Sequence, residues 1–178
     1  MREFEINTAQ LRELCEKLTA GDKVYLSGTV FTSRDAAHKR IFEYLESGIP
    51  LPYDLRDAVI YYAGPTPTPP GMAIGSCGPT TSSRMDSYAP RLYDLGVCAT
   101  IGKGERNDEV CDAVKRNKGI YLCAIGGAGA LAAKAVTDCR VIAFEDLGCE
   151  SVKQLTFNRF PLTVGIDCSG GNIFKHRN

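Results

Sequence analysis

The sequence lacks three features that would each define a class of protein. Lysine and arginine together number 21, as do aspartate and glutamate, so the formal net charge is zero. Nucleic-acid-binding proteins are usually clearly basic, so that class is disfavoured. No apolar run approaches the roughly 20 residues that a membrane-spanning helix needs. Residues 1–5 contain no apolar core of a secretory signal, which predicts a cytoplasmic protein.

Close pairs of cysteine are also absent. The chain has eight cysteines in 178 residues, but none of them forms a Cys-x-x-Cys pair. Structural zinc sites and most iron–sulfur sites use at least one such pair. We therefore expect no metal site made by this chain alone. The thiols are expected to be reduced and mostly to act as small buried side chains.

The length and the hydrophobic pattern predict one α/β domain over residues 1–178, in which helices pack on a mixed sheet. Alternation in the last third predicts several strands between residues 152 and 174, with residues 167–171 as a hairpin turn. The patterns upstream predict strands at 23–30, 59–63, 97–101, 120–125 and 141–144, and helices at 7–18, 34–47, 107–116 and 128–136.

The first candidate segment for function begins where the strand at 23–30 leads into the helix at 34–47. Helix N-termini offer free N–H donors, so such junctions are where α/β proteins bind ligands. Arg34 is expected in the first helical turn, where a cation opposes the helix dipole unless an anion binds there. His38 follows one turn later, and a lone histidine at this place is more often packed and hydrogen-bonded than catalytic.

The second candidate segment is rich in hydroxyl groups. Gly78 and Pro79 predict a turn, and residues 80–83 are all threonine or serine. Arg84 comes four residues after Thr80, so in a helix both side chains would face one pocket and form a cradle for a carboxylate or phosphate. Cys77 precedes the turn, so a thiol enzyme centred on it is a further hypothesis.

The third candidate segment is Lys103, which lies between two glycines after the strand at 97–101. The glycines let the backbone and the ammonium group approach a ligand together, although the spacing of a P-loop is absent. Together with Arg34 and Arg84, this lysine predicts a site for a small molecule that carries two carboxylates, or for a phosphate.

At these residues the chain resembles the β subunit, or the C-terminal domain, of class I iron–sulfur fumarases and the related tartrate dehydratases. The resemblance is carried by residues 27–40, 78–86 and 102–104, and it continues through 126–132, 145–148 and 160–167. It implies a swivelling β/β/α fold and a hydro-lyase that interconverts fumarate and (S)-malate. Dehydration of L-tartrate to oxaloacetate is the close alternative.

The resemblance also implies roles and partners. Thr80 matches the family's catalytic base, and Arg34, Arg84 and Lys103 match its substrate-binding cations. Gly78 and Thr81 are expected to bind substrate with them, Thr81 stays a second candidate for the base, and His38 is expected behind these groups. The [4Fe–4S] cluster is expected on an α subunit and not on this chain, in a heterotetramer of two α–β pairs. A non-catalytic anion-binding scaffold is the alternative from another class.

Overall fold

Strands and helices alternate along the first two thirds of the chain, and long strands follow. The structure is a computed structural model that describes residues 1–175. The strands are β1 (Glu3–Asn7), β2 (Lys23–Thr32), β3 (Val59–Tyr61), β4 (Ala99–Gly102), β5 (Ile120–Cys123), β6 (Val136–Ala143) and β7 (Val152–Ile166). The α-helices are α1 (Thr8–Leu14), α2 (Asp35–Ser47), α3 (Ala89–Asp94), α4 (Asp108–Arg116) and α5 (Gly129–Lys134). Short 3-10 helices are η1 (Cys15–Lys17), η2 (Ser82–Met85) and η3 (Glu145–Glu150).

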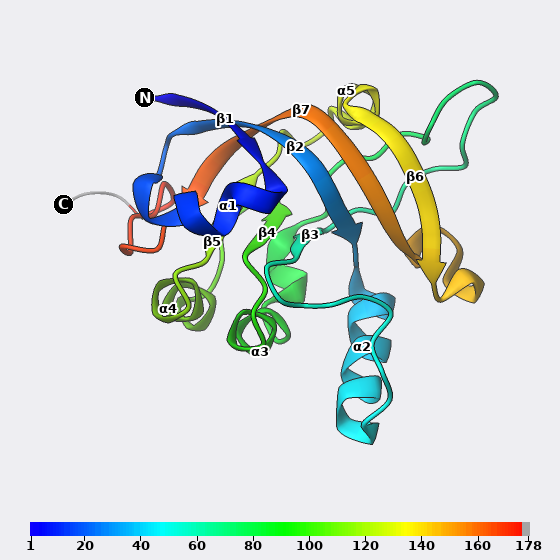
Figure 1. Ribbon diagram of the computed structural model, residues 1–178, viewed down its shortest axis with the longest axis horizontal. Helices are drawn as coiled ribbons and strands as arrows, with labels where there is room; N and C mark the ends of the chain where they lie inside the picture. Colours follow the sequence, from blue (N-terminus) through cyan, green and yellow to red (C-terminus); the bar gives the residue numbers. More distant parts are fainter. Residues whose placement is uncertain (176–178) are drawn as a thin grey trace.

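Five of these strands close into a barrel. β2, β3, β4 and β5 pair in parallel in this order, and β7 runs antiparallel to both β5 and β2. β1 extends the sheet in parallel beside the first half of β2, and β6 extends it antiparallel to the first half of β7. Figure 1 shows β2, β7 and β6 as long curved ribbons, with β3, β4 and β5 behind them. The prediction of a mixed sheet with packed helices is confirmed.

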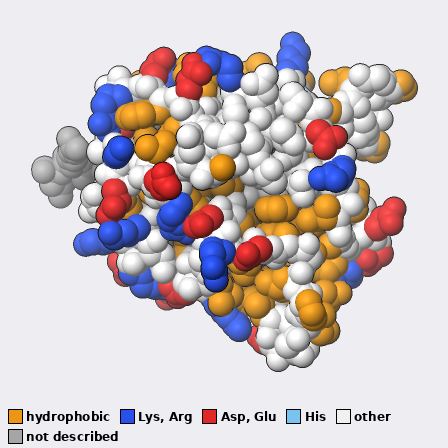
Figure 2. All heavy atoms as spheres, viewed as in Figure 1, with side chains coloured by type: hydrophobic (Ala, Val, Ile, Leu, Met, Phe, Trp, Pro, Cys, Tyr) orange, Lys and Arg blue, Asp and Glu red, His pale blue; other side chains and the backbone are white. Residues whose placement is uncertain are grey.

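The short parallel strands β3, β4 and β5 consist mostly of apolar residues because they are covered on both faces. Every residue of β3 and β4 is buried. β7 instead alternates over much of its length, with Leu155 and Phe157 in the core. α2 projects away from the barrel in Figure 1, and Figure 2 shows apolar side chains gathered over it. Within residues 1–175, no helix is both long enough and apolar enough to cross a bilayer.

Several expected elements differ from the structure. Residues 3–7 form the strand β1, which the sequence pattern did not predict. The helix expected at 128–136 is the shorter α5, because Val136 already begins β6. The several strands expected after residue 152 are one strand of 15 residues, β7. The turn at 167–171 is confirmed by the Asp167 N–H, which donates to the Gly171 carbonyl at 3.0 Å.

Candidate functional site

The carboxyl ends of β2, β3, β4 and β5 lie at one end of the barrel because these strands run parallel. The chain leaves the strands there at Arg34, Gly64, Lys103 and Gly126. We refer to these four residues, with the segment 78–84, as the rim. Ligands of α/β sheets bind outside the carboxyl ends of the strands, so the rim is where a site is expected.

The hydroxyl segment is inserted between the ends of β3 and β4. The Thr80 N–H donates to the Tyr62 carbonyl at 2.6 Å, and the Ser82 N–H donates to the Lys103 carbonyl at 2.9 Å. Thr81 and Lys103 form a parallel bridge. A side chain at Gly102 would collide with the Ser82 hydroxyl, so a glycine is needed for this close approach. The insertion places Thr80 and Thr81 directly beside Lys103.

The helical prediction for this segment is wrong. Thr80 lies before η2, which covers only Ser82–Met85, so Thr80 and Arg84 are not one turn apart on a helix. The physical reason is that the Thr80 N–H donates to the carbonyl of Tyr62, the residue directly after β3, and this bond keeps the segment extended. The sequence therefore gave the wrong local geometry for this segment, although Thr80 and Arg84 both lie at the rim.

Arg34 is the N-cap residue of α2, one position before the first helical turn in which it was expected. Its Nε lies 3.4 Å from the Oε1 of Glu150 and is buried without a hydrogen-bond partner in the described part of the chain. The guanidinium packs against Gly64, because a Cβ atom there would lie 2.6 Å from Nη1. The side chain is 21% exposed, so the guanidinium is held in place but still reaches the surface.

Arg84 reaches the same helix terminus from η2. Its Nε and Nη2 donate to the two carboxylate oxygens of Asp35, at 3.1 and 2.8 Å. Asp35 follows Arg34 directly in the sequence and is the first residue of α2. The structure thus brings the two predicted arginines together. It also shows that each already faces a carboxylate of this chain, which the sequence analysis did not foresee.

Lys103 differs from the arginines in its surroundings. Among residues 1–175, no carboxylate lies within ion-pair distance of its ammonium group. Its side chain lies along Gly126, where a Cβ atom would be 3.7 Å from Nζ. Gly78 packs in turn against Gly129 at the start of α5. The glycine patch at 126–129 therefore lets two rim segments approach closely, and the substrate-binding role of Gly78 stays a prediction.

His38 is fully buried behind Arg34. Its Nδ1 lies 2.9 Å from both the Ser33 hydroxyl and the Arg34 carbonyl, and its ring packs against Tyr62 and Tyr88. Burial lowers the pKa of His38 to about 4, so the imidazole is neutral near pH 7. This is the packed, hydrogen-bonded histidine that was expected, and it lies behind the residue that it supports.

Arg106 is a residue of this region that the sequence analysis missed. Its side chain is fully buried below the hydroxyl segment, where Nε donates to Asp86 at 2.6 Å and Nη1 donates to Thr100 at 3.1 Å. The guanidinium also lies over the rings of Tyr62 and Tyr121. An arginine in a loop carries no local signal of burial, because its partners come from other elements.

The cysteines do not form a reactive or metal-binding centre at the rim. Cys77 is buried, and desolvation raises the pKa of its thiol to about 12, so this geometry gives no support to a thiol nucleophile. In the part of the chain that the structure describes, no three His, Cys, Asp or Glu side chains are grouped to hold a metal ion. Residues 1–175 therefore offer no ligand set that fits an iron–sulfur cluster.

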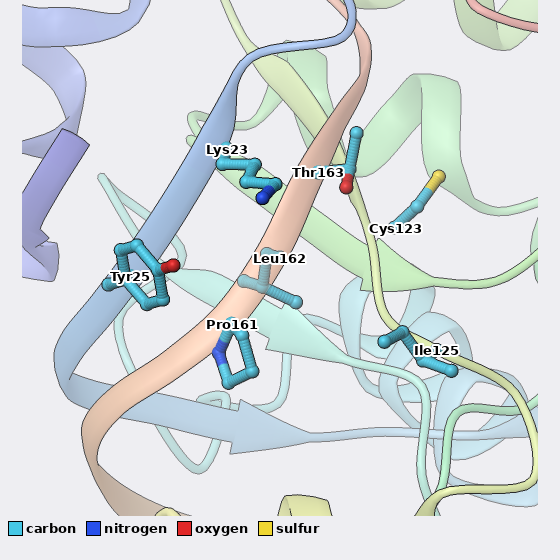
Figure 3. A pocket seen from close by; sticks show the side chains of 7 residues that line it. All are labelled: Lys23, Tyr25, Cys123, Ile125, Pro161, Leu162 and Thr163. Carbon is cyan, nitrogen blue, oxygen red and sulfur yellow. The ribbon is translucent and has the colours of Figure 1, made fainter. Parts of the chain in front are cut away.

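A cavity of about 210 Å³ lies on the outer face of the barrel, and none of the predicted site residues lines it. Figure 3 shows the seven side chains that line it, which come from β2, from β7 and from the end of β5. The cavity is mostly apolar, and its one cation, Lys23, already pairs with Glu3 at 3.3 Å. It does not have the character of a dicarboxylate site.

The chain is thus a mixed α/β protein whose closed barrel carries cations and hydroxyl groups at the carboxyl ends of its parallel strands. The family model described as Fumarase C-terminus matches residues 1–177, and the chain belongs to this family. The resemblance drawn from the sequence is thereby confirmed.

The share of each relative's length that this chain covers differs between the fumarate hydratases and the tartrate dehydratase subunit. Fumarate hydratase 2 of Leishmania major is 39% identical over 168 residues, which cover 93% of this chain and 30% of the relative. The aerobic class I fumarate hydratase of Escherichia coli (strain K12) is 38% identical over 155 residues, 86% of this chain and 28% of the relative. The L(+)-tartrate dehydratase subunit beta of the same strain is 33% identical over 163 residues, 89% of this chain and 80% of the relative. The chain thus spans less than a third of these two fumarate hydratases.

Proposed function

We propose that this chain is the β subunit of an iron–sulfur hydro-lyase that interconverts fumarate and (S)-malate. The rim is the observation that carries the proposal, because it gathers two arginines, a lysine and two threonine hydroxyls at one end of the barrel. Guanidinium and ammonium groups bind carboxylates, so this set suits a substrate with two of them. The fumarate hydratases among the relatives support the same reaction.

The proposed chemistry assigns a role to each rim residue. Thr80 is the base that removes the proton beside a substrate carboxylate, and Thr81 is the second candidate. Removal of that proton builds negative charge on the adjacent carboxylate, which Arg84 and Lys103 stabilise, while Arg34 binds the substrate's other carboxylate. The same cations favour the alkoxide form of a nearby threonine, since opposite charges favour the ionised form.

The proposal includes a partner. An α subunit would hold the [4Fe–4S] cluster and supply the proton donor, in a cytoplasmic heterotetramer of two α–β pairs. The alignment with a protein named as a subunit beta favours this division into two chains. We further propose that residues 1–178 form one domain of the swivelling β/β/α type, of which the last three residues lie outside the described part of the structure.

Dehydration of L-tartrate to oxaloacetate is the second candidate function. It is favoured by the tartrate dehydratase subunit, of which the chain covers 80%. Tartrate differs from malate by one hydroxyl group, and a site that hydrogen-bonds this group can discriminate strongly. A comparison of kcat/KM for malate and tartrate on the assembled complex decides between the two.

The test of the proposed function uses the complex of this chain with its α subunit, purified without oxygen. Thr80→Val removes the hydroxyl and keeps the branched shape, and we expect it to lower kcat by roughly 100-fold or more, the scale of general base catalysis. Thr81→Val is the matched control and should lower kcat less than tenfold. The reverse result would move the base to Thr81.

Two outcomes would contradict the proposal. A wild-type complex that turns over neither malate nor tartrate would remove the hydro-lyase function. Unchanged activity in both Arg34→Ala and Arg84→Ala would favour the non-catalytic scaffold instead.

A further inference from the structure

The carboxylate of Glu150 faces the buried Nε of Arg34. Glu150 lies at the end of η3, far from α2 in sequence, and its Oε1 is 3.4 Å from the Nε of Arg34. Both side chains are about one-fifth exposed, at 22% and 21%. Within residues 1–175, the Arg34 side chain has no other ion pair and no hydrogen bond. Its orientation thus depends on Glu150 and on the packing against Gly64.

Two sets of hydrogen bonds fix the position of Glu150, one to its side chain and one to the turn that carries it. Its Oε2 accepts the Ala36 N–H at 3.2 Å, in the first turn of α2, where the helix dipole favours a carboxylate. The turn that carries it is held by Lys153, whose Nζ donates to the Ser151 hydroxyl at 2.7 Å and lies 3.2–3.3 Å from the carbonyls of Gly148, Cys149 and Ser151. Lys153 is 9% exposed, so this clamp is largely shielded from water.

We propose that Glu150 is a positioning residue for Arg34, which holds the guanidinium by its Nε edge and leaves the Nη groups to receive a substrate carboxylate. This inference rests on the proposed function for the role of Arg34 in binding. Because Glu150 already holds the guanidinium, Arg34 does not have to reorient when a substrate carboxylate binds. This lowers the conformational entropy that the side chain loses on binding.

The first arm of the test observes Arg34 directly in the full chain by nuclear magnetic resonance. The Nε–H signal of Arg34 is assigned by its loss in Arg34→Lys. In Glu150→Gln the amide oxygen still accepts the Ala36 N–H, but the charge that faces Nε is gone. We expect the Nε–H of Arg34 to exchange with water at least tenfold faster in this variant.

The second arm measures kinetics on the complex with the α subunit. An arginine that binds a non-reacting carboxylate equally in the ground state and the transition state affects KM more than kcat. Glu150→Gln should therefore raise KM for malate about tenfold or more and change kcat less than threefold. Glu150→Asp keeps the charge and should recover part of the loss in both arms.

Asp146→Asn is the matched control. Asp146 also lies on η3 and also pairs with an arginine of α2, since Arg40 donates to its two oxygens at 2.7 and 2.9 Å. This variant removes an equivalent link between η3 and α2 without touching Arg34. We expect wild-type exchange at the Arg34 Nε–H and wild-type KM.

The outcomes separate this inference from the proposed function. Unchanged Nε–H exchange in Glu150→Gln, or an unchanged KM in an active complex, overturns the positioning role. The same rise in KM in Asp146→Asn would also overturn it, because a general loosening of η3 would then explain the effect. An inactive wild-type complex refutes the proposed function, and the resonance arm still decides whether Glu150 holds Arg34.

Discussion

His38 illustrates how one buried residue makes stability depend on pH. The imidazole is enclosed by Tyr62, Tyr88 and the first turn of α2, and its Nε2 is buried without a hydrogen-bond partner among the described residues. Protonation would place a charge there, so desolvation lowers the pKa of the folded state to about 4. The unfolded chain binds the proton near the ordinary pKa of about 6.5.

The prediction at this scale is a loss of stability on mild acidification. Between about pH 6.5 and pH 4, His38 is protonated in the unfolded state but not in the folded state. The free energy of unfolding therefore falls as the pH is lowered through this range. The full effect of the lowered pKa on the free energy of unfolding is up to about 3 kcal/mol. Urea unfolding at pH 7, 5.5 and 4.5 measures it, with His38→Gln as the reference.

The reference variant isolates the histidine from other groups. Carboxylates such as Asp94, Asp108 and Asp146 have lowered pKa values because of their basic partners, and they too lose stabilisation in acid. Their contribution is shared by both proteins and cancels in the difference. Parallel stability curves for the wild type and His38→Gln would show that His38 does not titrate in this way.

At the scale of single elements, the sequence predicts what local signals specify. α4 has Asn107 as its cap, whose side chain accepts the Val110 N–H at 2.9 Å, and the predicted helix at 107–116 differs from the structure only by this cap residue. β1 has a single fully buried residue, Ile6, so its short sequence carries almost no strand signal. It forms because β2 offers a free edge, and this partner is not visible in a local pattern.

In the candidate site, too, some positions follow from local sequence signals and others depend on tertiary contacts. Arg34 and Lys103 follow predicted strands, so their place at one end of a parallel sheet could be expected. Glu150 and Arg106 could not be chosen, because their partners come from elements far away in the sequence. The extended form of the hydroxyl segment likewise depends on its insertion between β3 and β4, which is a tertiary contact.

The buried pair of Arg106 and Asp86 leads to a prediction about the elements that it joins. Asp86 also accepts the Asn107 N–H at 2.8 Å, so the pair links the end of η2 to the start of α4. Arg106→Met leaves a buried carboxylate without its cation and should lower the free energy of unfolding by about 3–5 kcal/mol. Urea unfolding of the isolated chain measures this loss.

A double variant checks the cause. Arg106→Met with Asp86→Asn removes both charges, and an amide oxygen can still accept the Asn107 N–H. If the uncompensated carboxylate causes the loss, the double variant should be more stable than the sum of the two single changes predicts. Additive losses would mean that the packing of the arginine over the two tyrosine rings dominates.

For the whole molecule, the barrel separates a stabilising end from the candidate site. The amino ends of β3, β4 and β5 lie opposite the rim, and Arg12 of α1 reaches the segments that lead into all three. Its Nε donates to Asp57 at 2.7 Å, Nη2 to the Gly96 carbonyl at 2.7 Å, and Nη1 to the Asn117 carbonyl at 3.0 Å. One side chain thus holds together three connections at the end remote from the site.

This separation predicts that stability and substrate binding can be changed independently. Arg12→Met should lower the free energy of unfolding by about 1–3 kcal/mol, because two buried or half-buried carbonyls and a carboxylate lose a charged donor. Arg116→Met is the matched control, since its pair with Asp94 is exposed and should contribute less than about 1 kcal/mol. In the assembled complex both variants should keep the wild-type KM for malate. A raised KM in Arg12→Met would contradict this prediction. It would mean that a change at the amino ends of the strands alters the geometry of the rim through the barrel.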